Sequence, residues 1–537
     1  MRFLKFVITL FILTLAGPQL SFAYQPPAGI PEPMWGDFSP IDTKAPAHPS
    51  DWPSKSVTDF YYVDPSHPNA TDTNNTYGYP DKPRKSFREG TYTAGSYVEL
   101  HGGTYTGGGQ IIITAQGTQA KPVWIRGSDD KKPTMRGQFI VKGSYIILEN
   151  LNFDTDLKSF KLRPHNSSTL HHAAIRNCVL TGTGKSMGFG SVIQIHGAAS
   201  FRTHDIVVYN NLIHDHGDNA ATKENDYHGV HVSSHADNIW ILDNTIYNLG
   251  GDSVQIGAAS IADQYRASHI YIGNNLMHSN LENAVDIKEA NHVVMSGNTA
   301  YNFKSAPSSA GEVVVIHNKA DHVWVINNTI HSGVYGIIST ASTNTYFIGN
   351  EIHDTSVGIH FRGASTGGII NNTIYNYNKG IHLVQGGAYT VTNNILTNRI
   401  ASAGYDILVD DPNTASKSTI DNNIIHNAAN NVRIDWNTPN AMDLQTFIST
   451  TGKCQSCDSG DPKLLDLATN KATITSNSKD IAINQGKLDP NYAKYQGIYG
   501  APINKDIKGN KRLMGITYDI GAFELRAPSP PSIISIQ

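Results

Sequence analysis

The stretch HGVHVSSHADNIWILDNTIYNL, residues 228–249, contains three short runs, GVHVS, NIWIL and NTIY, which turn residues separate. Their β-branched and aromatic side chains favour strands. Alternation along the first run points Val230 and Val232 to one side, and His231 and Ser233 to the other. Three short strands joined by tight turns suggest one coil of a larger repeating structure.

An asparagine-centred phrase like LDNTIY recurs from the first third of the chain almost to its end. The repeated residues are Asn150, Asn177, Asn211, Asn244, Asn275, Asn298, Asn328, Asn350, Asn372, Asn394 and Asn423. The successive gaps are 27, 34, 33, 31, 23, 30, 22, 22, 22 and 29 residues. A repeat of this length, built from short strands, predicts a solenoid. We place the repeated asparagines in turns, where the amide bonds its own bend and the next coil, and where left-handed backbone angles are tolerated.

A second fixed position in the repeat carries histidines that alternate with other residues. The histidines are His214, His278, His331, His353 and His426, and Tyr247, Ala300 and Tyr375 take the same position in other coils. We expect this column to stack coil upon coil and to have a structural role.

The chain has 537 residues and begins with Arg2, Lys5, an apolar run and Ser21-Phe22-Ala23. This pattern predicts a secretory signal peptide cut after Ala23, because the apolar run is short for a membrane anchor. We therefore expect a secreted or periplasmic protein with no stable membrane insertion after cleavage. The formal charge of −4 becomes −6 without Arg2 and Lys5, and no block of like charges occurs, so we do not expect a nucleic-acid partner.

The three cysteines divide into two kinds. Cys178 follows a repeat asparagine, so we expect a buried thiol in the core. Cys454 and Cys457 form C-x-x-C in an exported chain, which favours a local disulfide. A redox site would need a βαβ context, and a zinc site would need a second pair of ligands.

Coil lengths predict where a binding site lies. The coils that end at Asn211, Asn244, Asn275 and Asn328 exceed the 22-residue floor by 12, 11, 9 and 8 residues. Insertions on a solenoid form loops, which tend to carry binding sites, here around a groove suited to a long polymer.

Two outward columns run past these loops. The first is Gln194, His231, Gln255, Asp286, Val315, Ile338, His360 and His382, and the second is His196, Ser233, Gly257, Lys288, His317 and Arg362. The turns before the strands add Asp226, His228, Asp252, Glu282 and Asn283. Asp286 and Lys288 lie on one face of one strand, and His317 follows one coil later. Acidic, basic and imidazole groups therefore gather on one wall.

The repeats resemble right-handed parallel β-helix proteins of the pectate-lyase-like superfamily over residues 58–525. FYYVDP, GSYVELHGGTY and DIKGNKRLMGITYDIGAFE resemble the entry and closing segments of such helices. The resemblance implies an all-β, right-handed parallel β-helix of about 11 or more coils with capped ends. We therefore expect five parts: a signal peptide (1–23), a Pro-rich segment (24–57), the β-helix (58–444), a C-terminal capping region (445–526) and a tail (527–537).

Such enzymes include polysaccharide lyases, which cleave uronic-acid polymers by β-elimination, often with calcium. The resemblance implies that Lys288 is the base, with His317 or Arg362 holding the substrate carboxylate or assisting the leaving group. It implies calcium on Asp226, Asp252 and Asp286, and an acidic polysaccharide on His231, Gln255 and Tyr227.

Three other functions stay open at this stage. A glycoside hydrolase would need two carboxylates such as Asp252 and Asp286. A uronate epimerase would need a second acid such as His231 or His317. A glycan-binding or adhesion protein would need no catalyst, since the fold alone does not decide function.

Overall fold

The structure, a computed structural model, describes residues 35–525 except 131, 156–157, 165–168, 183–187, 224, 259, 308, 364, 429–430, 465–466, 468–471, 479–480, 501, 513–516 and the side chains of 107–108. The predicted signal peptide, the predicted tail and residues 24–34 of the Pro-rich segment lie outside the described residues. None of the helices in the described part of the chain has the length and hydropathy that a membrane span requires.

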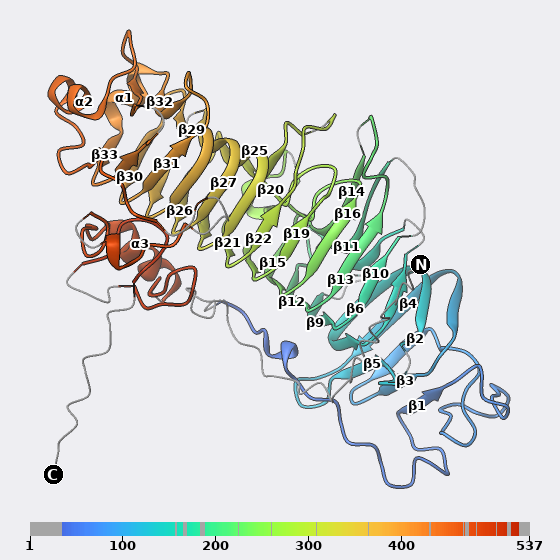
Figure 1. The fold of residues 1–537 in the computed structure, drawn as a ribbon. Coiled ribbons are helices and arrows are strands. Elements are labelled where there is room, and N and C mark those ends of the chain that lie inside the picture. The colour runs from blue at the N-terminus through green and yellow to red at the C-terminus, as the bar shows by residue number, and fades with distance from the viewer. Residues whose placement is uncertain are drawn as a thin grey trace, which may run out of the picture.

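Three parallel sheets wind around one axis (Figure 1). Sheet 1 contains β1 (Phe60–Val63), β3 (Tyr97–Leu100), β5 (Val123–Gly127), β9 (Leu170–Arg176), β12 (Thr203–Tyr209), β15 (Ala236–Leu242), β18 (Ser268–Gly273), β21 (Asn291–Ser296), β24 (Asp321–Ile326), β26 (Thr343–Ile348), β28 (Thr366–Ile370), β30 (Ala388–Thr392) and β33 (Thr419–Asp421). Sheet 2 contains β7 (Asn152–Asp154), β10 (Val179–Thr181), β13 (Leu212–His216), β16 (Thr245–Leu249), β19 (Leu276–His278), β22 (Thr299–Tyr301), β31 (Ile395–Arg399) and β34 (Ile424–His426).

Sheet 3 contains β2 (Gly90–Thr93), β8 (Phe160–Leu162), β11 (Phe189–Ile195), β14 (Asp226–Val232), β17 (Val254–Ile256), β20 (Val285–Lys288), β23 (Glu312–His317), β32 (Tyr405–Val409) and β35 (Ile434–Trp436). Five longer strands turn a corner between sheets, namely β4 (Thr104–Gln116), β6 (Thr134–Glu149), β25 (Thr329–Thr340), β27 (Glu351–Arg362) and β29 (Thr373–Leu383). The helices are α1 (Pro412–Lys417), α2 (Leu444–Thr451) and α3 (Pro490–Tyr499), with 3₁₀ turns η1 (Ser39–Ile41), η2 (Asp263–Tyr265) and η4 (Ser476–Ser478).

The coil quoted above shows how the fold repeats. Its three runs are β14, β15 and β16, which pair in parallel with β17, β18 and β19 of the next coil. Inward residues align from coil to coil, so Val230, Val254 and Val285 form one buried aliphatic column. The predicted right-handed parallel β-helix is confirmed.

Buried asparagines connect the coils at the turn from sheet 1 to sheet 2. From Asn244 to Asn423, each ladder side-chain oxygen accepts from both the backbone N–H and the side-chain amide of the ladder asparagine before it. The first ladder oxygen, that of Asn211, accepts from the backbone N–H of Cys178. Each amide also donates to a backbone carbonyl, for example Asn298 to Ile272 at 2.9 Å. These bonds satisfy polar groups that are almost completely buried.

The predicted alignment of the repeat is wrong at its first two members. Val179 pairs with Leu212, so Asn177 is equivalent to Asn210, and Cys178 occupies the ladder position before Asn211. Asn150 is equivalent to Asn177 in the same way, because Asn152 pairs with Val179. The left-handed backbone angles, which we expected at the ladder asparagines, occur instead at the residue before each, for example Asn210 with a φ of 51°. The ladder thus begins later than predicted, and Cys178 is a buried free thiol, as expected.

An aromatic column covers the outside of sheet 2. His214, Tyr247, His278, Tyr301, His331, His353 and Tyr375 stack at 4.5–5.1 Å between ring centroids, with interplanar angles of 1–16°. The predicted stacking is confirmed, but the prediction for Ala300 is wrong, because Tyr301 pairs with His278 and Ala300 points into the core. Thr397 interrupts the column before His426.

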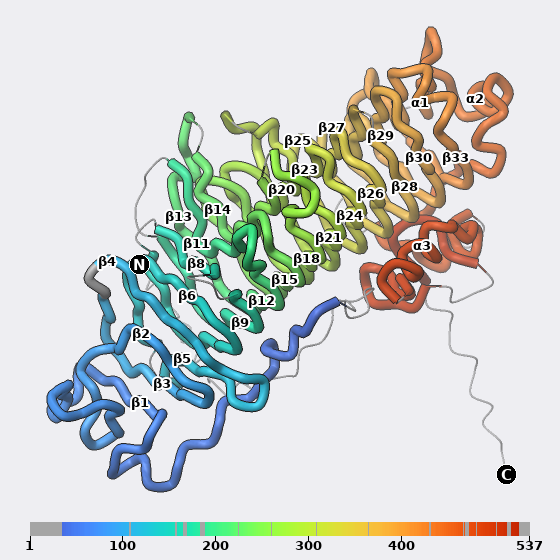
Figure 2. The backbone as a smooth tube through the Cα atoms, turned by 180° about the vertical axis from the view of Figure 1, so that it is seen from behind, coloured from blue at the N-terminus to red at the C-terminus, as the bar shows by residue number. Residues whose placement is uncertain are grey.

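Segments from both ends of the chain cover sheet 1. We call residues 35–57 the strap, whose backbone runs along the outer face of the sheet (Figure 2). Its Trp35, Ile41 and Trp52 are buried in a cluster with residues of sheet 1. Tyr495 and Tyr499 of α3 pack on the same face, around Trp324. Trp35 also contacts Tyr499, with 5.3 Å between the rings. The outer face of sheet 1 is therefore largely occupied.

The C-terminal region contacts the β-helix in two places. Phe447 of α2 packs on Trp436 of the last strand of sheet 3, and Cys454 and Cys457 form the expected local disulfide nearby. Residues 484–500 and 517–525 lie along the flank, where the backbone carbonyls of Gln485 and Asp519 accept from the turn residues Asn422 and Asn371.

Replacing a ladder asparagine tests the importance of this register. Asn298→Ala removes bonds to Asn275, Asn328 and Ile272 and leaves buried polar groups without partners. We expect a loss of about 2–4 kcal/mol of stability, measured by denaturant unfolding followed by circular dichroism. Asn440→Ala, at an exposed loop position, is the matched control. Equal unfolding midpoints for the two variants would contradict a stabilising role for the ladder.

Candidate functional site

The outward columns of sheet 3 form as predicted. Gln194, His231, Gln255, Asp286, Val315, Ile338, His360 and His382 pair in succession from β11 to β29. In the second column, Lys288 pairs with His317, and Thr340 pairs with Arg362. Chemically active side chains from separate coils are therefore neighbours on one wall.

Asp286 is the centre of a three-residue group. Its Oδ2 lies 2.8 Å from Lys288 Nζ, and its Oδ1 lies 2.7 Å from His317 Nε2. The Asp286 side chain is 8% exposed, whereas those of Lys288 and His317 are 27% and 25% exposed. A buried carboxylate thus holds two partly exposed nitrogen groups at the surface.

The charges in this group reinforce one another. Burial opposes ionisation of Asp286, but the bonds from His317 and Lys288 outweigh it and lower the pKa of that carboxyl. Burial also disfavours the Lys288 ammonium, but Asp286, followed by Asp252 and Glu282, raises its pKa above the usual value. The pair is therefore a carboxylate and an ammonium at neutral pH.

A second, more deeply buried group lies beside the first. The ligand atoms of His228, Asp252 and Glu282 lie within 4.8 Å of one another. Asp252 is 1% exposed, and its Oδ1 accepts from the backbone N–H of Asn283 at 3.0 Å. Burial, followed by the nearby Asp286 carboxylate, raises the pKa of Asp252 well above its usual range. Burial lowers the pKa of His228 to about 4, so its imidazole is neutral.

This arrangement differs from the calcium site implied by the resemblance. Both oxygens of Asp286 already bind Lys288 and His317, so Asp286 is not directed at Asp252 as a shared ligand. The group that could hold a metal ion contains an imidazole, whereas calcium prefers six to eight oxygen ligands. Acidic groups able to hold a metal do gather here, but Asp226, Asp252 and Asp286 do not fit calcium as a set.

The three residues predicted to bind substrate are mainly engaged within the protein. His231 Nε2 lies 3.2 Å from the Gly257 carbonyl, and burial lowers the pKa of His231 to about 4. Gln255 donates to Asp252 at 3.3 Å. Tyr227 is 7% exposed and packs edge-on against His216. Of these, His231 and Gln255 lie on the outward column, while Tyr227 has little surface left for a sugar ring.

Arg362 lies away from the central group. It is exposed, and its Nε donates to Thr340 Oγ1 at 3.0 Å. Two coils separate it from His317, which is about 10 Å by strand spacing. The structure thus does not bring Arg362 together with Lys288 and His317.

Two members of the buried group, His228 and Glu282, received no role from sequence reasoning. In three consecutive coils a small residue precedes the inward valine, as Gly229-Val230, Ser253-Val254 and Ala284-Val285. Backbone bonds align these small residues, and so place His228, Asp252 and Asn283 at one turn position. Aligning the coils on this small residue would have predicted that His228 and Asp252 are neighbours in adjacent coils.

Comparison with known proteins supports the fold. The family described as periplasmic copper-binding protein (NosD) matches residues 275–453. No curated protein sequence matches the chain. The PL6 family alginate lyase AlyGC has a similar structure, with a TM-score of 0.52 and 13% identity; the match covers 74% of this chain and 56% of the lyase.

Two further solved structures are more distant. A pectate lyase aligns with a TM-score of 0.38 and 14% identity over 87% of this chain and 96% of its own. The A-module of a mannuronan C-5 epimerase from Azotobacter vinelandii aligns with a TM-score of 0.31 and 14% identity, over 63% of this chain and 81% of its own. The likeness to the alginate lyase AlyGC, at 13% identity, is a likeness of fold.

The opposite pKa shifts of Asp252 and Asp286 predict opposite effects on stability. Folding favours the protonated form of Asp252, so its contribution to the free energy of unfolding falls as pH rises above about 4. Asp252→Asn removes the buried carboxylate and should therefore raise the unfolding midpoint near pH 7. Folding favours ionised Asp286, whose contribution is present above about pH 4 and is lost below it, so Asp286→Asn should lower the midpoint near pH 7. Thermal unfolding at pH 4 and pH 7 measures both differences, which should shrink at the lower pH. Shifts of the same sign in both variants would refute the assigned protonation states.

Proposed function

We propose that this protein cleaves a uronic-acid-containing polysaccharide by β-elimination on the outward face of sheet 3. The observation that carries the proposal is the Asp286 group, in which a buried carboxylate presents the ammonium of Lys288 and the imidazole of His317 at the surface. The alginate lyase of similar fold supports the choice of substrate class and reaction.

In this reaction a base removes the proton from C5 of the uronate. The electrons of the C5–H bond form a C4–C5 double bond, the bond from C4 to the linking oxygen breaks, and that oxygen takes a proton. The uronate carboxylate must be neutralised, because the negative charge that develops at C5 spreads onto it. The site therefore has to supply a proton acceptor and a positive charge close together.

His317 and Lys288 are suited to these two roles. Nε2 of His317 donates to Asp286, which leaves Nδ1 of the ring to accept the C5 proton. Lys288 carries the positive charge and lies beside it on the adjacent strand. This reverses the roles implied by the resemblance, because an amine whose pKa is raised stays protonated near neutral pH and so has no lone pair free to accept the C5 proton.

Basic side chains elsewhere on the same wall support a long anionic substrate. Lys161 precedes Gln194 in the first outward column, and burial, followed by the neighbouring Arg163, lowers the pKa of Lys161. Four coils separate β8 from β20, which is about 19 Å by strand spacing. Arg362 lies on the other side of the site. Lys161, Lys288 and Arg362 are therefore spaced along the β-helix axis, as binding of a polymer of carboxylate-bearing sugars would require.

Hydrolysis is the second candidate, on a specific observation. The pKa of Asp252 is raised and that of Asp286 is lowered, and such a separation is typical of an acid and base pair in glycosidases. The 1% exposure of Asp252 disfavours direct contact with a sugar. Products distinguish the two reactions, since a hydrolase releases reducing ends without the ultraviolet absorbance of an unsaturated sugar.

The place of action follows from the predicted signal peptide and from the matched family, which is described as periplasmic. We infer that the protein acts outside the cytoplasm, where extracellular polysaccharides or their fragments are available.

Activity is tested on alginate, pectate, glycosaminoglycans and sulfated algal glycans, with calcium or a chelator, by ultraviolet absorbance and reducing ends. We expect one uronate polymer to yield unsaturated products. Lys288→Ala and His317→Ala should each lower kcat by about 100-fold or more, while Lys288→Arg keeps the charge and retains part of the activity. Lys417→Ala, on the exposed side of α1, is the control.

The variants also separate the two possible bases. If Lys288→Arg is inactive and His317→Ala stays active, Lys288 rather than His317 is the base. Full activity in both alanine variants would show that this group does not carry the reaction.

A further inference from the structure

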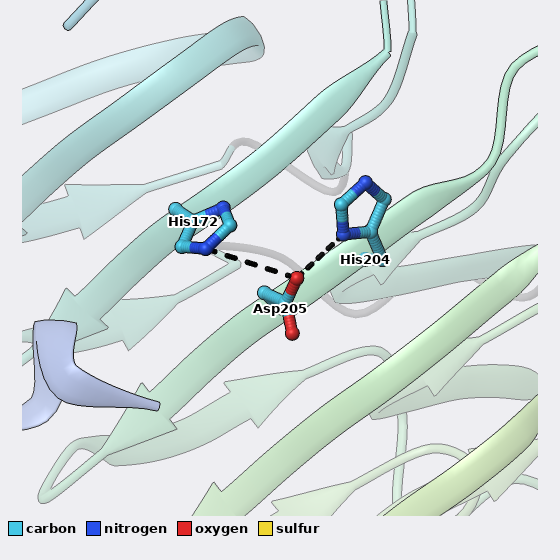
Figure 3. Close-up of side chains that lie close together, drawn as sticks. All are labelled: His172, His204 and Asp205. Atoms are coloured by element: carbon cyan, nitrogen blue, oxygen red, sulfur yellow. Dashed lines mark hydrogen bonds and ion pairs between the residues drawn. The ribbon is translucent and has the colours of Figure 1, made fainter. Parts of the chain in front are cut away.

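Two imidazoles and a carboxylate converge on the outer face of sheet 1, on the far side of the molecule's core from the Asp286 group. His172 lies on β9, and His204 and Asp205 lie on the neighbouring strand β12. Figure 3 shows the Asp205 carboxylate between the two rings. Asp205 Oδ2 lies 2.6 Å from His204 Nδ1 and 3.9 Å from His172 Nε2.

The backbone explains why adjacent residues project to one side. His172 and Asp205 have left-handed φ values of 54° and 56°, and both are skipped in the pairing of β9 with β12. The normal alternation of side chains along a strand is interrupted there, so His204 and Asp205 meet on the same face. Left-handed backbone is unfavourable for such residues and persists where neighbouring contacts compensate.

The strap adds a second carboxylate. Asp37 Oδ2 lies 3.5 Å from His172 Nε2, and the backbone N–H of Asp37 donates to Asp205 Oδ1 at 2.9 Å. Gly36 permits this approach, because a Cβ at that position would lie 2.3 Å from Asp205 Oδ1. The strap thus places a second carboxylate beside His172, next to the three side chains whose ligand atoms lie within 4.8 Å of one another.

This convergence is unusual within the molecule. Adjacent histidine and aspartate also bond at His214–Asp215, Asp321–His322 and His353–Asp354. Among the described residues, only this group and the His228 group bring three metal-binding side chains within 4.8 Å. A hollow lined by Ser39, Pro40, Tyr145 and His172 lies next to the group and gives solvent a route to the imidazole.

We propose that His172, His204, Asp205 and Asp37 bind a divalent transition-metal ion of the zinc class, which fastens the strap to the β-helix. Zinc binds imidazole and carboxylate at about 2.0–2.2 Å, so tetrahedral donors lie roughly 3.3–3.6 Å apart. The measured separations of 2.6, 3.5 and 3.9 Å bracket this value. Calcium and magnesium prefer oxygen ligands and suit two imidazoles poorly.

Binding changes the bonds within the group in a defined way. The hydrogen bond between His204 and Asp205 opens by less than about 1 Å, and any proton on His204 Nδ1 leaves, since a metal binds the unprotonated nitrogen. The ion then links β9 and β12 to the strap through Asp37. Trp35 of the strap also contacts Tyr499 of α3. The bound ion therefore helps to hold both the strap and α3 against the outer face of sheet 1.

The test uses the full mature chain, freed of metal and titrated with Zn²⁺ by calorimetry, with Ca²⁺ in parallel. Trypsin cleavage after the exposed Lys44 and Lys55 of the strap is followed by mass spectrometry. We expect Zn²⁺, and not Ca²⁺, to bind and to slow strap cleavage. His172→Ala, His204→Ala and Asp37→Asn should each weaken this binding at least about tenfold and abolish the protection.

Two controls separate this group from other ligands. His214→Ala removes a similar bonded pair elsewhere, and His228→Ala removes the other three-residue group. Both should retain zinc-dependent protection of the strap. Asp37 lies on the strap, outside the β-helix core, so its variant stays informative if a histidine variant unfolds. The proposal is overturned if Zn²⁺ leaves strap cleavage unchanged, or if protection survives in Asp37→Asn and His204→Ala.

Discussion

The asparagine ladder is the interaction on which the rest of this structure depends. A strand repeats its side-chain direction every two residues, so a slip of one residue would move core valines outward and surface charges inward. Each ladder amide bonds both a backbone N–H and a side-chain amide of its neighbour, as between Asn350 and Asn372. A slipped register would leave these buried groups without partners, at about 1–3 kcal/mol for each. The ladder therefore selects one register, and with it the composition of every outward column.

That register explains why much of the fold could be predicted from the sequence. Valine and isoleucine alternate with polar residues in most coils, so both columns of sheet 3 could be aligned by their apolar neighbours. The alignment failed where this signal is ambiguous. In RNCVL a single asparagine could belong to either of two turn positions, and Cys178 in fact occupies the buried one. In NTAY the small Ala300 points inward and the larger Tyr301 joins the stack, although both fit a strand.

The candidate site shows the limit of such reasoning in electrostatic terms. Register places Asp286, Lys288 and His317 together, but it does not reveal which partners each side chain chooses. In the structure the Asp286 carboxylate contacts both Lys288 and His317, which raises the pKa of Lys288. Asp252 instead lies in a separate group with His228 and Glu282. These choices depend on rotamers and burial rather than on spacing. The strap group was beyond sequence reasoning for another reason, because Asp37 and His172 are far apart in the chain and meet only through tertiary packing.

The three outer faces of the β-helix have different capacities for a polymer. Sheet 1 is covered by the strap and α3, so the metal-binding group there lies beneath chain segments. Sheet 2 carries the aromatic column, whose rings already occupy one another's faces from His214 to Tyr375. Sheet 3 presents polar and charged residues in its outward columns, of which the first is interrupted by Val315 and Ile338, with Lys288 and His317 part-exposed over a buried carboxylate. The proposed long anionic substrate would therefore find complementary charges on sheet 3 rather than on the other two faces.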